Sequence, residues 1–330
     1  KLYLVGVAST ALTLFGLSLV FGVSGTTSIQ QLLEVPPSPL LIGGMILVLA
    51  GLGFKIGVVP FHMWVPDTYQ GAPTPFVAFL SVAPKLAGFA ALSSLFLLGF
   101  SGQYSTWLPI LTGLSLLSMT AGNLLAIGQS NVKRLLGYSG IAHIGYMLMA
   151  FATGSADGAG MLLFYGGGYV VTNVGAFLVV EAMAAQGGDD SIESFKGLAQ
   201  RTPWLALAML LFLLSLAGIP FVIGFWAKLY VFVVAWRAGL LWLVAAGAVL
   251  AVLALFYYLR IARAMYMDPP AKTESVRVAF PLRVAILLCL AGVVGLGAYP
   301  KPLLEQAEAS AKPFFSTTQI AARSGHVDSP

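Results

Sequence analysis

The chain has 330 residues, of which 58% are hydrophobic and 9% are charged, and its net charge is +5. Soluble domains carry roughly 25% charged residues, so 17 basic and 12 acidic residues cannot cover a water-facing surface of this size. The composition therefore excludes a soluble enzyme, a disordered chain and a nucleic-acid-binding protein, and it predicts an integral membrane protein. The single cysteine, Cys289, excludes a disulfide framework and a thiolate metal site.

Nine stretches are long enough to span a membrane as helices, for which about 20 apolar residues are needed. They cover residues 2–23, 40–59, 76–100, 107–128, 132–153, 160–185, 203–236, 239–265 and 280–300. Within each stretch, apolar residues occupy the whole circumference of the expected helix and glycines are scattered among them. This pattern favours packed helices over barrel strands of alternating polarity. We therefore expect an all-α bundle over residues 1–300 and a polar C-terminal tail over residues 301–330.

Two of these spans are irregular. The stretch 203–236 would be about 51 Å long as a straight helix, whereas the hydrocarbon core is about 30 Å thick. It contains Gly218-Ile219-Pro220, where a helix should break. The stretch 40–59 runs into Pro60 and Pro66. Paired broken helices indicate a transport site. Because the second break lies five spans after the first, and five is odd, a repeat that relates them must be inverted.

The basic residues near the span ends predict the orientation. The N-terminal face carries ten of them: Lys1, Lys133, Arg134, Lys196, Arg201, Arg260, Arg263, Lys272, Arg277 and Arg283. The opposite face carries four: Arg237, Lys301, Lys312 and Arg323. By the positive-inside rule, the N-terminal face is expected to be cytoplasmic and the C-terminal tail to lie on the opposite side.

Three further lysines lie inside apolar sequence, where a lysine costs about 2.5–3.5 kcal/mol. Lys55 and Lys228 lie beside the two predicted breaks, and Lys85 follows the helix-kinking Pro84. A desolvated ammonium group can gain or lose a proton near neutral pH. The three lysines are therefore candidate proton carriers; the alternative is that they snorkel or form structural pairs.

His143 is the histidine in the interior of a span, and its ordinary pKa near 6.5 suits a proton relay. It is equally compatible with a hydrogen-bonded interior group. Lys133, at the start of the same span, is a weaker candidate because orientation signals are expected there. His62 follows the first break and either loads protons or belongs to a proline-stiffened loop. The polar neighbours that could extend a path from His143 are Tyr138, Ser139 and Tyr146.

Three blocks, in order, resemble one known family. They are GLGFKIGVVPFHMWVPDTYQGAPTPFVAFLSVAPKLAGFA, QSNVKRLLGYSGIAHIGYMLMA and LLSLAGIPFVIGFWAKLYVF. They are similar to the antiporter-like subunits of respiratory complex I, the proton-translocating NADH:quinone oxidoreductase, and more to the subunit N (subunit 2) type than to the longer subunits L and M. Related sodium/proton antiporter subunits share this resemblance.

The resemblance implies an inverted-repeat antiporter-like fold with two discontinuous helices. The lysines of the family's hydrated polar axis match Lys55, Lys85 and Lys228, and its connecting residue matches His143, with Lys133 as the weaker match. The resemblance also implies proton translocation coupled to quinone reduction elsewhere in the complex. No cofactor is then expected in this chain; NADH, FMN, iron–sulfur clusters and quinone belong to partner subunits.

The resemblance further implies a setting for the chain. The expected partners are other membrane-arm subunits, such as the antiporter-like subunit M and the small subunits K and J, within the lipid bilayer of a bacterial inner membrane. In the family, a glutamate one helix upstream pairs with the first lysine, and no residue here matches it. Because the chain starts with Lys1 at what resembles the family's sixth helix, we expect it to begin partway through a longer protein.

Two other functions remain open at this point. A subunit of a multisubunit sodium/proton antiporter that works without electron transfer would use the same three lysines. A structural membrane subunit would keep them only as paired groups.

Overall fold

The structure is a computed structural model that describes every residue except 1, 186, 271–273 and 325–330, and no side chains at 313, 314 and 316–324. Helices dominate the described part of the chain, and a single isolated bridge joins Asn131 to Ser191. Seven helical segments of the described chain are long and apolar enough to cross a membrane. They are α1 (Leu2–Ser24), α2 (Pro39–Ile56), Thr74–Gly99, Ser101–Ile127, α8 (Ala156–Ala184), α12 (Leu241–Tyr266) and α13 (Phe280–Ala298).

Two of these segments are made of successive helices. The first contains α4 (Thr74–Leu80), α5 (Ala83–Leu92) and the π-helix η2 (Ser93–Gly99), and the second contains the 3₁₀ turn η3 (Ser101–Gln103) and α6 (Tyr104–Ile127). The division between α4 and α5 lies just before Pro84, in the first turn of α5. A proline fits there because it has no N–H to donate and its φ is already helical.

The remaining two predicted spans form α7 (Val132–Phe151) and the pair α10 (Pro203–Ala217) and α11 (Ile223–Arg237). In α7, every residue except Arg134 is buried. A helix that is enclosed by other helices does not face lipid, so α7 can carry polar side chains such as Ser139 and His143 along its length.

Both predicted breaks are present, and they have the same backbone structure. Gly57 ends α2 with a φ of 80° and Gly218 ends α10 with a φ of 88°, a left-handed conformation that glycine adopts without strain. In each case the next N–H donates to a carbonyl five residues earlier, from Val58 to Gly53 at 2.9 Å and from Ile219 to Leu214 at 3.0 Å. After the first break the chain resumes as α3 (Trp64–Gly71), and after the second it resumes as α11.

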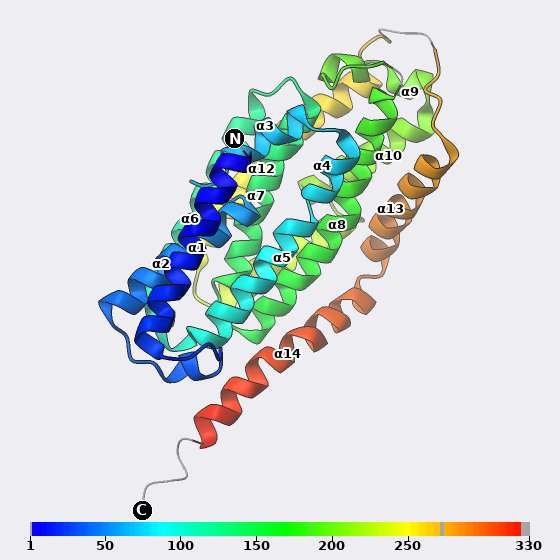
Figure 1. Ribbon diagram of the computed structural model, residues 1–330. Coiled ribbons are helices and arrows are strands. Elements are labelled where there is room, and N and C mark those ends of the chain that lie inside the picture. The colour runs from blue at the N-terminus through cyan, green and yellow to red at the C-terminus, as the bar shows by residue number, and fades with distance from the viewer. Residues whose placement is uncertain (1, 186, 271–273, 325–330) are drawn as a thin grey trace, which may run out of the picture.

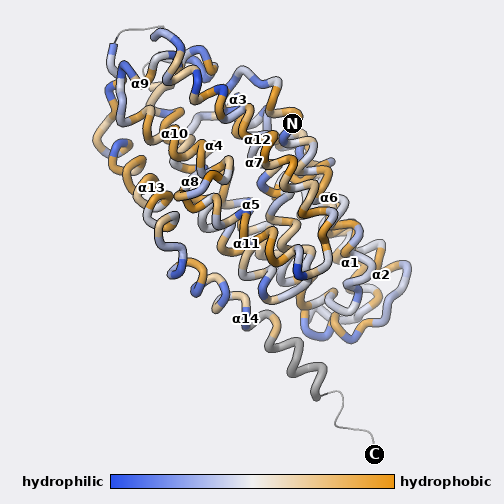
Figure 2. Tube along the Cα trace, turned by 180° about the vertical axis from the view of Figure 1, so that it is seen from behind, coloured by the Kyte–Doolittle hydropathy of each residue, from blue (hydrophilic) through white to orange (hydrophobic). Residues whose placement is uncertain are grey.

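The helices lie side by side in an elongated bundle with α7 and α8 in its interior (Figure 1). α3 and the short α9 (Leu198–Arg201) lie at the same end of the bundle. The first broken helix therefore runs towards this end, whereas the second, which follows α9, runs away from it. This opposite direction is the one that an inverted repeat requires. Apolar residues follow the length of the bundle, and polar residues gather at its ends (Figure 2).

The predicted polar C-terminal tail contains a helix. α14 (Lys301–Ser324) lies along the outside of the bundle against α8 (Figure 1). Its apolar side faces α8, because Leu303 lies against Gly167 and Ala307 and Ala311 are buried. The other short elements are η1 (Gln31–Glu34) and η4 (Ile192–Phe195).

Candidate functional site

Lys228 is held by the second helix break. It projects from α11, is 6% exposed, and its Nζ donates to the carbonyls of Leu216 at 2.9 Å and Ala217 at 2.7 Å. These carbonyls belong to the last turn of α10, where a helix leaves its C=O groups without intrahelical partners. The same turn carries the negative end of the helix dipole. The break thus frees the acceptors that bind the ammonium group.

Lys85 is buried between three helices. It projects from α5, is 1% exposed, and its Nζ is 3.4 Å from the hydroxyl of Tyr169 on α8. The ammonium group also lies over two rings, 5.5 Å from the centre of Tyr169 and 5.9 Å from the centre of Tyr69. On the α7 side it touches Gly140, where an added Cβ would be only 2.7 Å from Nζ. The missing side chain at Gly140 therefore makes room for the lysine.

His143 lies on α7 one turn after Gly140, and both of its ring nitrogens have hydroxyl partners. Nδ1 is 2.7 Å from the Tyr165 hydroxyl of α8, and Nε2 is 3.3 Å from the Tyr258 hydroxyl of α12. Its ring centre is 5.1 Å from that of Tyr169, the residue that contacts Lys85. His143 therefore stands next to the Lys85 site.

A small cavity joins His143 to the second break. Its lining includes His143, Tyr165, Tyr169, Thr172, Ser215 and Leu216, and it has room for about one water molecule. Tyr169 is the partner of Lys85, and the Leu216 carbonyl accepts a hydrogen bond from Lys228. His143 lines this small cavity directly, and Lys85 and Lys228 reach it through Tyr169 and Leu216, so the three residues form a single site.

Lys55 lies apart from this cluster. It is in the last turn of α2, its side chain is exposed, and its ammonium group is 5.9 Å from the centre of the Phe54 ring. Lys85 and Lys228 are therefore buried as expected, whereas Lys55 is exposed in the part of the chain that the structure describes. The adjacent break holds His62, which is partly buried and whose Nδ1 has no hydrogen-bond partner among the described residues.

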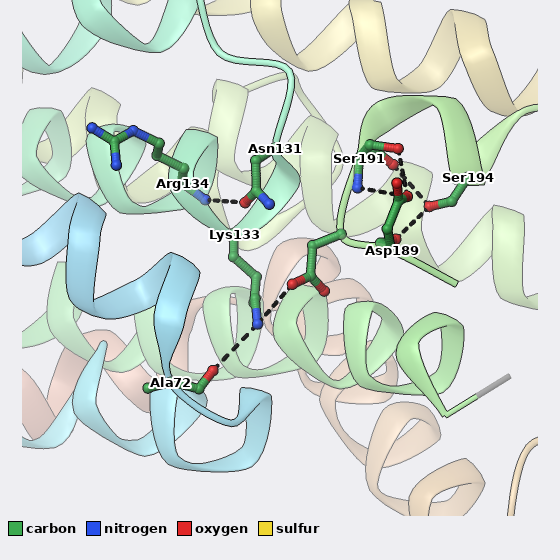
Figure 3. Close-up of polar contacts among 8 residues, drawn as sticks. Ala72, Asn131, Lys133, Arg134, Asp189, Ser191 and Ser194 are labelled. Carbon is green, nitrogen blue, oxygen red and sulfur yellow. Dashed lines mark hydrogen bonds and ion pairs between the residues drawn. The ribbon is translucent and has the colours of Figure 1, made fainter. Parts of the chain in front are cut away.

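Lys133 lies at the end of the bundle that carries α3 and α9, in the polar contacts shown in Figure 3. Its Nζ is 2.8 Å from a carboxylate oxygen of Asp190 and donates to the Ala72 carbonyl at 3.2 Å. Asp190 belongs to the connection between α8 and α9, and Ala72 follows α3. Lys133 thus ties the first broken helix to that connection, and structural pairing describes its contacts.

Of the three neighbours expected to extend a path from His143, Ser139 does so through the Tyr258 hydroxyl, and the ring of Tyr146 lies 6.3 Å from the imidazole, centre to centre. Tyr138 instead faces Arg134, whose guanidinium carbon is 5.8 Å from the ring centre. The hydroxyls that bind the imidazole come from residues 22 and 115 positions away, on α8 and α12. One signal was available in the sequence: Tyr165 and Tyr169 are four residues apart and therefore share one face of a helix.

Residues 1–254 match the family described as NADH:quinone oxidoreductase/Mrp antiporter, TM. The chain is 44% identical over 320 residues to the NADH-quinone oxidoreductase subunit N of Moorella thermoacetica and 44% identical over 317 residues to that of Heliobacterium modesticaldum. Each comparison covers 96% of this chain and 67% of the relative. The chain thus spans about two thirds of the length of these relatives.

Solved structures show the same fold. One chain of respiratory complex I from Thermus thermophilus with bound aureothin superposes with a TM-score of 0.80 at 35% identity, over 92% of this chain and 67% of that chain. A chain of the Mrp complex from Dietzia sp. superposes with a TM-score of 0.87 at 23% identity, over 94% and 66%. With the two discontinuous helices and the buried lysines, these similarities show that the chain belongs to the family of antiporter-like membrane subunits found in NADH:quinone oxidoreductases and Mrp antiporters.

Proposed function

We propose that the chain is the antiporter-like N subunit of a proton-translocating NADH:quinone oxidoreductase and that it moves protons through Lys85, His143 and Lys228. The burial of these three side chains beside one small cavity, which His143 lines and which the lysines reach through Tyr169 and Leu216, carries the proposal. Two ammonium groups in a low-dielectric interior are costly unless bonded, and here the surrounding groups are hydroxyls, carbonyls and ring faces. Such groups tolerate both the charged and the neutral form of a lysine.

In the proposed path, protons are taken up at the N-terminal face and reach the region of Lys55 and Lys85. Lys85 passes a proton towards the Tyr169 hydroxyl, and a water molecule in the cavity carries it to His143. The imidazolium then returns the proton to the cavity near the second break, where neutral Lys228 accepts it. Release from Lys228 to the opposite face completes the transfer, and no step needs a co-reactant beyond the proton and water.

The driving force comes from charge outside this path. A change in nearby charge alters the proton affinity of each lysine, and a tenfold change in the protonation equilibrium corresponds to about 1.36 kcal/mol. NADH, FMN, iron–sulfur clusters and quinone would belong to partner subunits, and subunits M, K and J are the neighbours expected to pass the charge change on. We place the N-terminal face in the cytoplasm and the complex in a bacterial inner membrane.

The comparisons favour this function over a sodium/proton antiporter subunit that works without electron transfer. Relatives that match at 44% identity are N subunits of NADH-quinone oxidoreductases, whereas the Mrp complex shares the fold at 23% identity. The two functions differ in what drives the proton. NADH oxidation drives it in the first, and a sodium gradient drives it in the second.

The test is the number of protons moved per NADH oxidised by the assembled complex in inverted membrane vesicles. We expect Lys85→Ala and Lys228→Ala to lower this ratio and Lys196→Ala to leave it unchanged. Lys196 is a suitable control because it lies on the α8–α9 connection, paired with the exposed carboxylate of Glu193. A wild-type ratio in both Lys85→Ala and Lys228→Ala would refute the path. Exchange driven by sodium without NADH would favour the antiporter.

A further inference from the structure

The imidazole of His143 has two hydrogen-bonded sides that differ in their surroundings. On the Nδ1 side lies Tyr165, which also lines the cavity shared with Tyr169 and Leu216. On the Nε2 side lies Tyr258, which is outside that lining. Nδ1 therefore faces the space through which protons are proposed to travel, and Nε2 faces away from it.

Tyr258 is itself held by a second hydroxyl. Its OH is hydrogen-bonded to the Oγ of Ser139, which lies on α7 one turn before His143. All three side chains are buried, with exposures of 2% for Tyr258, 1% for Ser139 and 5% for His143. A tyrosine hydroxyl has one proton to donate. If that proton goes to Ser139, the hydroxyl oxygen is free to accept from Nε2–H.

We infer that Tyr258 and Ser139 are positioning residues for His143: they keep the proton on Nε2, so that the imidazole gains and loses its relay proton at Nδ1. The inference rests on the proposed relay. In the neutral imidazole, Nε2–H donates to Tyr258 and Nδ1 is an acceptor. In the imidazolium, Nε2–H donates to the same oxygen and Nδ1–H faces Tyr165. The N–H bond at Nδ1 forms as the Tyr165 O–H bond breaks and that oxygen takes a proton from the cavity water. The same steps in reverse release the proton, while the Nε2 side does not rearrange.

This arrangement follows the general logic by which a second group fixes the tautomer and the orientation of a histidine. Without Tyr258, the proton of the neutral ring would be free to reside on Nδ1, which would block acceptance from the cavity. The hydrogen bond at Nε2 also favours the charged ring, because hydrogen bonds to a charged group are stronger than those between neutral groups.

The titratable groups that face His143 come from five helices: Lys85 of α5, Tyr146 of α7, Tyr165 and Tyr169 of α8, Lys228 of α11 and Tyr258 of α12. The adjacent Tyr257 provides a matched comparison for Tyr258. It is as buried as Tyr258 and its ring packs against that of Tyr258, with 4.5 Å between the ring centres, but its hydroxyl donates to Asn123 Oδ1 at 3.0 Å instead of contacting the histidine.

The experiment compares Tyr258→Phe with Tyr257→Phe in the assembled complex, measuring NADH-driven proton uptake by inverted vesicles between about pH 6 and 9. Each variant loses one buried hydroxyl and keeps its ring. We expect Tyr258→Phe to lower the His143-dependent part of pumping at neutral pH about tenfold, the effect of one hydrogen bond to a charged group. The alkaline limb of its pH profile should move about one unit lower, because the imidazolium forms less readily. Tyr257→Phe should move this limb clearly less than Tyr258→Phe does, because its hydroxyl does not bind the histidine.

Two further variants separate the possible outcomes. Ser139→Ala should move the alkaline limb in the same direction by a smaller amount, and it also tests the inference if Tyr258→Phe fails to assemble. In a His143→Ala background, Tyr258→Phe should cause no further loss. Wild-type pumping in His143→Ala would overturn the relay and this inference with it. A loss in His143→Ala together with unshifted profiles in Tyr258→Phe and Ser139→Ala would overturn the positioning role alone.

Discussion

Gly140 offers a way to disturb the proposed path without removing a titratable group. An ideal Cβ at this position would be 2.7 Å from Lys85 Nζ and 2.9 Å from the Tyr169 hydroxyl. Non-bonded heavy atoms separate to about 3.5 Å, so in Gly140→Ala each group must withdraw by roughly 0.6–0.8 Å. Their own separation of 3.4 Å is already at the long limit for a hydrogen bond. The contact between Lys85 and Tyr169 should therefore be lost.

The expected loss of function follows from the energy of that contact. A hydrogen bond to a charged group contributes about 1.5–3 kcal/mol, which corresponds to roughly a tenfold to hundredfold slower transfer step. We therefore expect Gly140→Ala to abolish at least about nine tenths of the Lys85-dependent proton pumping, defined as the difference between wild type and Lys85→Ala. Folding should be preserved, because the displaced atoms end flexible side chains and alanine is favoured over glycine within a helix by about 0.5–1 kcal/mol.

The assay is NADH-driven acidification of inverted vesicles, normalised to NADH oxidation by the same membranes. Gly113→Ala on α6 is the matched control, since a Cβ there would meet no atom of the described residues within 4 Å. It should assemble and pump as the wild type does. Full pumping by Gly140→Ala would show that the Lys85–Tyr169 contact does not lie on the path, and the order of transfer from Lys85 to His143 would have to be abandoned.

Two predictions concern stability. Gly218→Ala places a Cβ on a residue with a φ of 88° and 2.7 Å from Lys228 Cδ, so it should destabilise the protein by about 1–2 kcal/mol and lower the melting temperature of the purified complex. Gly295→Ala is the control and should leave the melting temperature unchanged, because no described atom lies near its Cβ. Equal melting temperatures of Gly218→Ala and Gly295→Ala would contradict the role of the break. Asp190→Asn removes the charge that faces Lys133 at 2.8 Å in a largely buried pair, and it should lower the free energy of unfolding by about 1–3 kcal/mol. Glu193→Gln is the control: its carboxylate is 74% exposed, so the loss should be under about 1 kcal/mol. Equal losses in the two variants would show that burial of the pair is unimportant.

The sequence alone determined the helical membrane class and the positions of both breaks. These features are local, because about 20 apolar residues suffice for a span and a glycine followed by a proline ends a helix wherever the segment lies. The first break occurs at Gly57, three residues before the predicted Pro60, and the second occurs at Gly218, within the predicted Gly218-Ile219-Pro220. The opposite directions of the two broken helices also follow from the number of spans between them.

Only the tertiary structure decided which polar residues meet. Lys55, Lys85 and Lys228 have equally apolar sequence surroundings, yet Lys55 is exposed whereas the other two are buried beside His143. The hydroxyls that bind His143 and Lys85 come from residues 22, 84 and 115 positions away. Helix periodicity specifies which residues share a face, but the packing of α5, α7, α8 and α12 selects the facing partners. The site therefore depends on long-range contacts that no local pattern in this sequence encodes.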